Sequence, residues 1–184
     1  MYNSADVDTW SVSGVMSIIK SGSSDCAVNS VPEIIMNGGI KMNSSTINHW
    51  AWRSTINTQD GKDFGYLPLM PSGFFSHCVV ALDDSDLFVT GGFVHDFLEI
   101  PIPSDKSFLY HSDTGEWEEL QGVPTLRLTP MCSMVHKANG EQEVIVAGGT
   151  APENYESRDV VEIYNLQSKE WRLGKNVLMF VVPP

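Results

Sequence analysis

Short apolar runs alternate along the chain with clusters of Asp, Asn, Gly, Ser and Pro. The runs are rich in Val, Ile, Phe and Tyr, a composition typical of β-strands, and the polar clusters between them hold residues that favour turns. No long segment keeps the apolar period of a helix. The pattern therefore predicts an all-β fold.

The same pattern returns along the chain at a nearly fixed distance. Three apolar runs end in a double glycine, and the second glycines of these pairs lie 53 and 57 residues apart, at Gly39, Gly92 and Gly149. A large aromatic residue recurs in phase with them at intervals of 53 or 54 residues, at Trp10, Phe64, Trp117 and Trp171. Self-similarity at such a period indicates a repeat architecture.

Each period predicts four strands. For residues 68–120 we expect the strands at His77–Leu82, Leu87–Thr90, Ser107–Tyr110 and Glu116–Leu120. The turns between the first two and the last two of these strands consist of Asp, Ser, Thr and Gly.

A tyrosine precedes the recurring tryptophan by seven residues in two periods, as Tyr110 with Trp117 and as Tyr164 with Trp171. These aromatics are expected to supply contact area between neighbouring units. The period 11–67 has Asn57 and Phe64 where the pair is expected, and its third strand is hard to place around residues 49–56.

The three cysteines each stand ahead of a double glycine, at Cys26, Cys78 and Cys132. We interpret them as one repeat position that holds small, buried, apolar side chains. Their odd number and wide spacing are unlike a disulfide framework or a zinc site, which favours a reducing compartment.

Three features of the repeat resemble the kelch-repeat β-propellers: the apolar run that ends in Gly-Gly, the Tyr-x6-Trp pair, and the linker 67–71 (LPLMP) that leads to residues 76–78 (SHC). The resemblance implies an incomplete arc of about three four-stranded blades plus a partial N-terminal blade. The expected boundaries are the end of a blade over 1–10, blades over 11–67, 68–120 and 121–174, and a non-repeat tail over 175–184.

Propellers of this family commonly close into rings with more blades than this chain supplies. The chain is therefore expected to be a fragment of a larger kelch protein. An open arc would expose the apolar faces of its first and last blades, so self-association through open blade edges is also expected.

The net charge excludes some classes of partner. Eleven basic and 23 acidic residues give a formal net charge of −12, which repels phosphate backbones and anionic lipid, so neither nucleic acid nor a membrane is expected as a partner. The first ten residues show no secretory signal, and the apolar run 177–182 is far shorter than a membrane span. We expect a soluble, cytoplasmic protein.

Candidate chemistry is sparse. The five histidines show no ligand spacing on one element, so no metal and no cofactor is expected. A nucleophile elbow and a phosphate-binding loop are absent from the sequence. The chain is therefore not expected to be an enzyme.

Strand direction predicts where function lies. The loops between the second and third strands, and those that lead to the next unit, fall at one end of each unit and are longer than the turns at the other end. Long loops on a rigid scaffold are where binding residues gather. The predicted partner-binding residues are Phe74, Phe75, Phe93, His95, Asp96, Arg127, Glu153, Asn154, Tyr155, Glu156 and Arg158.

The resemblance implies a non-catalytic protein–protein interaction module that presents these loops to a protein partner. In a larger kelch protein this role is that of, for example, a ubiquitin-ligase substrate adaptor. The alternative that the resemblance leaves open is a kelch-fold enzyme of the sugar oxidase or sugar-acid isomerase type.

Overall fold

The computed structural model describes residues 20–21, 24–28, 33–38, 40–41, 51–55, 63–82, 86–95 and 101–175. Every one of these residues lies in a strand, a turn or a loop, and none lies in a helix. The expected all-β class is confirmed. No helix that could cross a membrane occurs in the described part of the chain.

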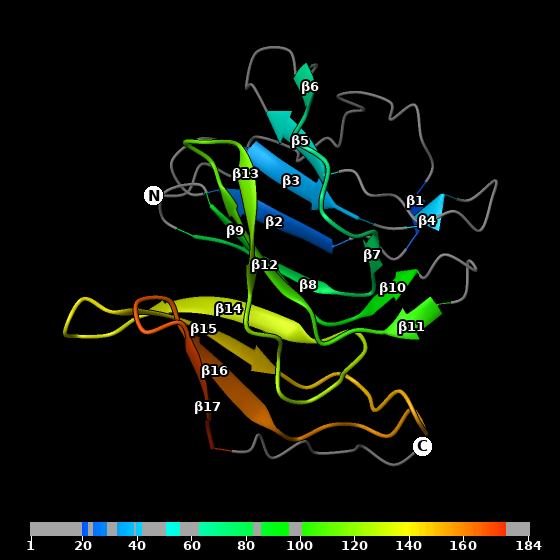
Figure 1. Cartoon of the computed structure of the whole chain (residues 1–184), viewed down its shortest axis with the longest axis vertical. Coiled ribbons are helices and arrows are strands. Elements are labelled where there is room, and N and C mark those ends of the chain that lie inside the picture. The colour runs from blue at the N-terminus through cyan, green and yellow to red at the C-terminus, as the bar shows by residue number, and fades with distance from the viewer. Residues whose placement is uncertain are drawn as a thin grey trace, which may run out of the picture.

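Three four-stranded antiparallel sheets make up most of the structure (Figure 1). The first sheet consists of β2 (Ser24–Val28), β3 (Glu33–Asn37), β5 (Ala51–Thr55) and β6 (Asp63–Tyr66). The second consists of β8 (Cys78–Ala81), β9 (Leu87–Thr90), β12 (Ser107–His111) and β13 (Glu116–Leu120). The third consists of β14 (Met131–His136), β15 (Gln142–Ala147), β16 (Val161–Asn165) and β17 (Glu170–Leu173).

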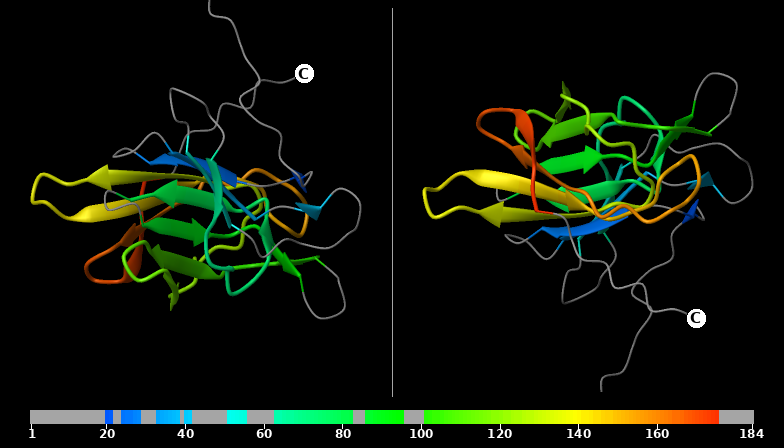
Figure 2. Two further views of the ribbon diagram at one scale, coloured as in Figure 1. Left: turned by 90° about the horizontal axis from the view of Figure 1, so that it is seen from above. Right: turned by 90° about the horizontal axis from the view of Figure 1, so that it is seen from below.

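The sheets repeat one arrangement. In each, the four strands pair in the order in which the chain supplies them. The first strand of each sheet lies beside the first strand of the next, so that β8 contacts both β2 and β14. Figure 2 shows the same sheets from above and from below. The arrangement is propeller-like.

The sequence-based strand assignment for the second sheet is confirmed closely. The strands β9 and β13 have the predicted bounds, β12 extends one residue further to His111, and β8 is shorter than predicted, from Cys78 to Ala81. The connections between these strands contain Asp, Ser, Thr and Gly, as in 83–86 and 112–115. Such residues favour turns, so the strands end where these connections begin.

In the first sheet, the prediction that Asn57 occupies the tyrosine position is wrong. Tyr110 pairs with Trp117 across β12 and β13, and in the first sheet Ser54 of β5 pairs with Phe64 of β6. Ser54, and not Asn57, therefore occupies the tyrosine position. The reason is the connection between β5 and β6, which is three residues longer than the one between β12 and β13.

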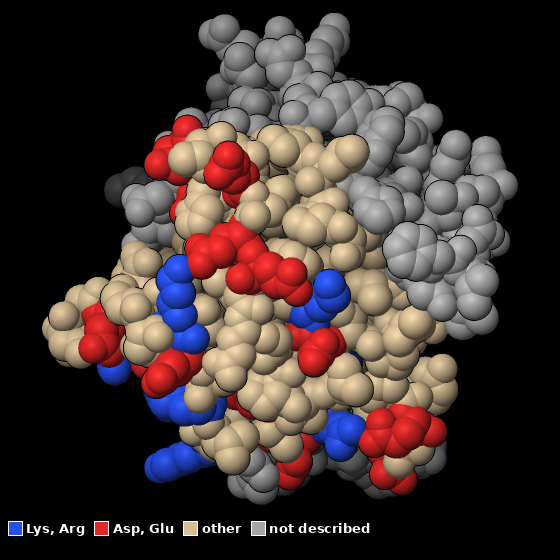
Figure 3. All heavy atoms as spheres, viewed as in Figure 1, with Lys and Arg blue, Asp and Glu red and all other residues tan. Residues whose placement is uncertain are grey.

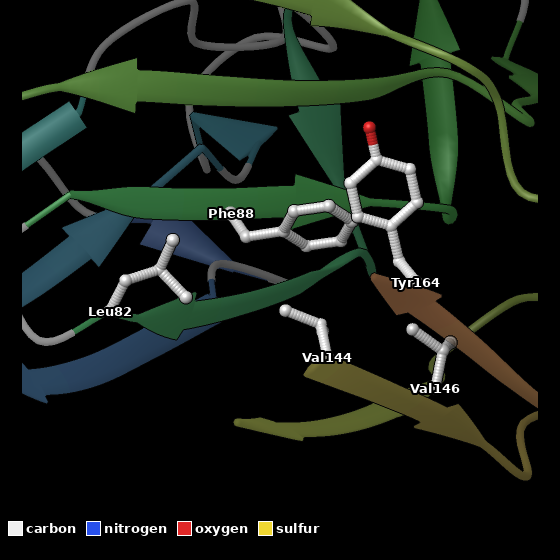
Figure 4. Packing of buried hydrophobic residues seen from close by; sticks show 5 residues of the cluster. All are labelled: Leu82, Phe88, Val144, Val146 and Tyr164. Carbon is white, nitrogen blue, oxygen red and sulfur yellow. The ribbon is translucent and has the colours of Figure 1, made fainter. Parts of the chain in front are cut away.

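The largest core cluster fills the contact between the second and third sheets (Figure 4). The ring of Phe88 lies against Tyr164, with centroids 5.3 Å apart, and Val144 and Val146 lie beneath these rings. Each such aromatic removes a large apolar area from water on folding. The recurring tryptophans also anchor neighbouring linkers, since the Trp117 indole N–H donates to the Pro68 carbonyl (3.2 Å) and the Trp171 indole N–H to the Gln121 carbonyl (2.9 Å).

The double glycine has a backbone role. Gly92 has φ +73°, and a Cβ atom built on it would lie 2.5 Å from the Phe75 carbonyl oxygen. The equivalent Gly149 has φ +79° and the Leu128 carbonyl in the same place. Only glycine fits a position that combines a left-handed φ with so close a backbone approach.

Two small sheets complete the described structure. One contains β7 (Phe74–Phe75), β10 (Phe93–His95) and β11 (Pro101–Pro103), in the order β11-β10-β7, and the other pairs β1 (Lys20–Ser21) with β4 (Ile40–Lys41). The first of these ties the linker before β8 to the loop after β9. The sequence pattern predicts loops for both segments, so the short strands β7, β10 and β11 correct that prediction.

The interpretation of the cysteines is also corrected. Cys78 of β8 forms a disulfide with Cys132 of β14, so two of the three cysteines pair across sheets. Their register differs as well: Cys78 pairs with Thr90 in its sheet, and the residue at that position in the third sheet is Met131, which pairs with Ala147. The cysteines therefore do not share one repeat position.

Candidate interaction face

The longer connections lie at one end of the sheets. The segments that lead into β8 and β14, the loop after β9 and the loop between β15 and β16 gather on the right of Figure 1, while the turn between β14 and β15 lies on the left. We call the end with the longer connections the long-loop face. The loops that the sequence predicts to lie at one end of each sheet thus lie on the same side of the molecule.

The loop 150–158 on this face is closed by hydrogen bonds between its own residues. The Ala151 N–H donates to the Glu156 carbonyl (2.8 Å) and the Tyr155 N–H donates back to the Ala151 carbonyl (2.8 Å). The Arg158 N–H closes the loop on the Gly149 carbonyl (2.9 Å), and its guanidinium donates to the Glu153 carboxylate (2.7 Å). The loop is therefore tied together by contacts between its own residues.

This loop presents a mixed aromatic and acidic surface. Tyr155 has a left-handed φ of +60° and is 71% exposed, so most of its side chain lies in solvent. Glu153, Asn154 and Glu156 are exposed beside it. Figure 3 shows acidic side chains gathered at the lower right of the molecule, the end at which this loop lies. An exposed aromatic with a polar rim has the composition of a protein contact.

Arg127 has a different place from the one predicted. Its side chain is fully buried, and its guanidinium donates to the Glu162 carboxylate and to the carbonyls of Gly148 (3.2 Å) and Val160 (2.9 Å). Burial lowers the pKa of Arg127 from its usual range, and the charge of Glu162 acts in the opposite direction. Arg127 therefore has a structural role beside the third sheet, whereas its neighbour Leu126 is exposed.

The phenylalanines predicted to contact a partner are likewise structural. Phe74 is fully buried and meets Phe108 edge to face, with centroids 5.7 Å apart. Phe75 is buried and stacks on Phe93 of β10 at 4.8 Å, while Phe93 itself is half-buried. These contacts pack β7 against β12 and β10, so the two phenylalanines of β7 stabilise the fold beneath the long-loop face.

The remaining predicted residues are only partly described. His95 ends β10, but its side chain lies outside the described residues, and so does Asp96. The structure thus brings Glu153, Asn154, Tyr155 and Glu156 together on one exposed loop, with half-buried Arg158 as their support.

Two exposed apolar residues on the long-loop face were missed by the sequence analysis. Ile102 lies on β11 and is 41% exposed, and Met131 begins β14 and is 65% exposed. Each stands among apolar or proline neighbours in the sequence, so the pattern alone indicates burial.

Within the described residues, no group of three or more His, Cys, Asp and Glu side chains could hold a metal ion.

Comparison with known proteins shows a similar fold in a solved structure. No protein-family model matches the chain, and no curated protein matches it in sequence. The solved structure of YjhT is similar, with a TM-score of 0.70 at 14% sequence identity over 89% of this chain. The chain spans 54% of the YjhT chain. At this identity the likeness shows the all-β, propeller-like fold and nothing of its chemistry.

Proposed function

We propose that the three sheets are blades of a kelch-type β-propeller that binds a protein partner through its long-loop face. The in-phase glycine and tyrosine–tryptophan repeats, the repeated four-stranded sheets and the likeness to YjhT support the propeller. The role is that of a scaffold, and the chain performs no reaction of its own.

One observation carries the binding role: loop 150–158 is exposed and is also tied down by hydrogen bonds within itself. Its backbone hydrogen bonds fix the chain between Gly149 and Arg158, while Tyr155 remains largely in solvent. A loop that is already ordered loses little conformational entropy when it binds. Aromatic side chains in such positions commonly dominate binding energy.

The charge of the loop selects the partner. Glu153 forms an ion pair with Arg158 within the loop, whereas the exposed Glu156 is one of the 23 acidic residues that give the chain its net charge of −12. Complementary potential guides association. The proposed partner therefore carries lysine or arginine next to a pocket for an aromatic ring.

A capture experiment tests the proposal. The immobilised chain, the variants Tyr155→Asn and Glu156→Lys, and the control Asp113→Lys are each incubated with cell extract, and the bound proteins are identified by mass spectrometry. Asparagine tolerates the positive φ of position 155 and removes the ring. Asp113 lies exposed in the turn between β12 and β13, away from the long-loop face. A partner held by the parent chain and the control, but lost by both loop variants, supports the proposal.

The alternative function, a kelch-fold enzyme, predicts different results. Such an enzyme of the sugar oxidase type would retain a metal through purification, which elemental analysis detects. One of the sugar-acid isomerase type would convert its substrate, which NMR spectroscopy of candidate sugar acids follows. Either result, together with unchanged capture by the loop variants, would replace the proposed scaffold role.

A further inference from the structure

A disulfide joins two sheets of this fold. Cys78 is the first residue of β8 and Cys132 the second residue of β14, and their Cα atoms lie 6.0 Å apart. The two strands lie side by side but belong to different sheets, so no ladder of backbone hydrogen bonds connects them. The disulfide closes a loop across 54 positions of the chain.

The register of the two sheets explains why this pair can form. Successive side chains of a strand point to opposite faces of its sheet. Val80, two residues from Cys78, packs on the third sheet, and Met134, two residues from Cys132, packs with the same cluster from the other side. Because Cys132 stands one register position beyond the equivalent of Cys78, the two sulfurs face each other. At the same position they would point the same way.

The linkers before the two cysteines are also joined to each other. The Thr129 N–H donates to the Ser76 carbonyl (2.9 Å), and the Gly92 N–H donates to the Arg127 carbonyl (3.0 Å). Both bonds connect the second sheet to the third, a few residues from the disulfide and at the long-loop face. The disulfide therefore lies beside the backbone hydrogen bonds that join the segments next to the second and third sheets.

We propose that the Cys78–Cys132 disulfide is a reversible latch between the second and third sheets, set by the thiol–disulfide state of the surroundings. Cys78 is buried, whereas Cys132 is half-buried, so we expect an external thiol to attack at Cys132. The inference stands on the disulfide and its register, and it is independent of the proposed binding role.

The exchange balances with a small disulfide such as oxidised glutathione. The Cys132 thiolate attacks one glutathione sulfur, and a first glutathione thiolate leaves. The Cys78 thiolate then attacks the Cys132 sulfur, which closes the protein disulfide and expels a second glutathione thiolate. The two protein thiols lose their protons and two electrons, and one oxidised glutathione becomes two reduced ones. Reduction follows the same steps in reverse, beginning at Cys132.

The test uses the full chain in glutathione buffers of graded ratio. Non-reducing peptide mapping should find residues 78 and 132 linked in oxidising buffer and alkylated in reducing buffer, with the mixed glutathione disulfide trapped on Cys132. The thermal midpoint should fall by about 10 °C on reduction, because the unfolded chain regains the freedom that a loop of this size removes. The Thr129 amide should lose hydrogen-exchange protection in the same buffers.

Two variants provide the comparison. Cys26→Ser should keep the redox-dependent midpoint, and Cys132→Val should abolish it, valine being the residue at the equivalent position of β8 (Val79). The proposal is overturned if peptide mapping of the parent chain finds both cysteines alkylated in oxidising buffer. It is also overturned if the parent midpoint does not respond to the buffer. Mapping the parent chain decides the question even if Cys132→Val fails to fold.

Discussion

The Arg127 guanidinium and the Glu162 carboxylate form a fully buried ion pair inside the third sheet, at the repeat position that an aromatic pair fills in the second. Glu162 pairs with Val146, as Phe108 pairs with Val89 in the preceding unit. Arg127 precedes Thr129 by two residues, as Phe74 precedes Ser76, and both Thr129 and Ser76 have left-handed φ angles. One fold thus accommodates two chemically different solutions at the same place.

This equivalence predicts a coupled effect on stability. Arg127→Met leaves the Glu162 carboxylate buried without its charge partner, and we expect it to lower the free energy of unfolding by about 3–5 kcal/mol. The double variant Arg127→Phe/Glu162→Phe copies the second sheet and should cost less than the sum of its two single variants. Urea unfolding followed by tryptophan fluorescence gives the value for Arg127→Met and the values for the double variant and its components, Arg127→Phe and Glu162→Phe. Additive losses would show that the two positions do not act as a pair.

The double glycine gives a prediction with its own control. Gly92→Ala places a Cβ atom 2.5 Å from the Phe75 carbonyl oxygen in addition to a left-handed φ. Gly140 also has a left-handed φ, +86°, but nothing lies within 4 Å of its Cβ position. We expect Gly140→Ala to cost about 1–2 kcal/mol of unfolding free energy from backbone strain alone, and Gly92→Ala to cost clearly more. Equal costs would mean that the close approach has no structural role.

A surface cluster predicts a measurable titration. The hydrogen bond from the Lys169 ammonium to the Glu118 carboxylate (2.5 Å) lowers the pKa of Glu118, and a further hydrogen bond from the His111 ring (3.1 Å) acts in the same direction. A pKa that is lower in the folded state stabilises the fold above the unfolded pKa, and this contribution is lost as the pH falls through the folded value. Because Glu118 is partly exposed, the contribution to stability is small.

The measurement is an NMR titration of the Glu118 side-chain carboxyl. Lys169→Asn, which suits the positive φ of position 169, should raise the pKa of Glu118 toward its ordinary value. The exposed Lys175 lies beyond the end of β17 and supplies the matched control, Lys175→Asn. An unchanged Glu118 pKa in Lys169→Asn would contradict the assigned cause.

Self-association remains a prediction. Val144 and Val146 pack on the second sheet, so the alternating residue Ile145 and its partner Ile163 lie on the opposite face of the third sheet, where Ile145 is half-buried and Ile163 is buried. We expect this face to pair with a second chain and light scattering to report twice the mass of one chain. Ile145→Lys should return the protein to a single chain. A parent chain that is already monomeric at micromolar concentration would contradict the expectation.

The sequence predicted the parts of the fold that depend on local pattern. Strand β9 was predicted with its observed bounds, because its apolar run ends at a double glycine that cannot continue a strand. The position of Ser54 in the first sheet was not predicted, because a longer connection shifts the register without any change in the apolar pattern. The disulfide was missed for a related reason: an offset of one register position between Cys78 and Cys132 cannot be read from the sequence spacing.

The candidate site was predicted in part. Glu153, Asn154, Tyr155 and Glu156 are exposed on the predicted loop, because a connection of this length has to leave the sheet. Arg127 was misassigned because an arginine in a linker usually faces water. A signal for its burial was present in Glu162, a single acid within an apolar strand, which requires a buried partner.

The affinity of the captured partner for Tyr155→Asn, compared with Asp113→Lys, tests the central claim most directly. Isothermal titration calorimetry of the parent chain and both variants gives the three dissociation constants, and circular dichroism confirms that each variant is folded. Loss of an exposed aromatic anchor is expected to weaken binding about 30-fold, the equivalent of about 2 kcal/mol, while Asp113→Lys leaves it unchanged. Weaker binding by Asp113→Lys, with the parent affinity retained in Tyr155→Asn, would contradict the assignment of the long-loop face.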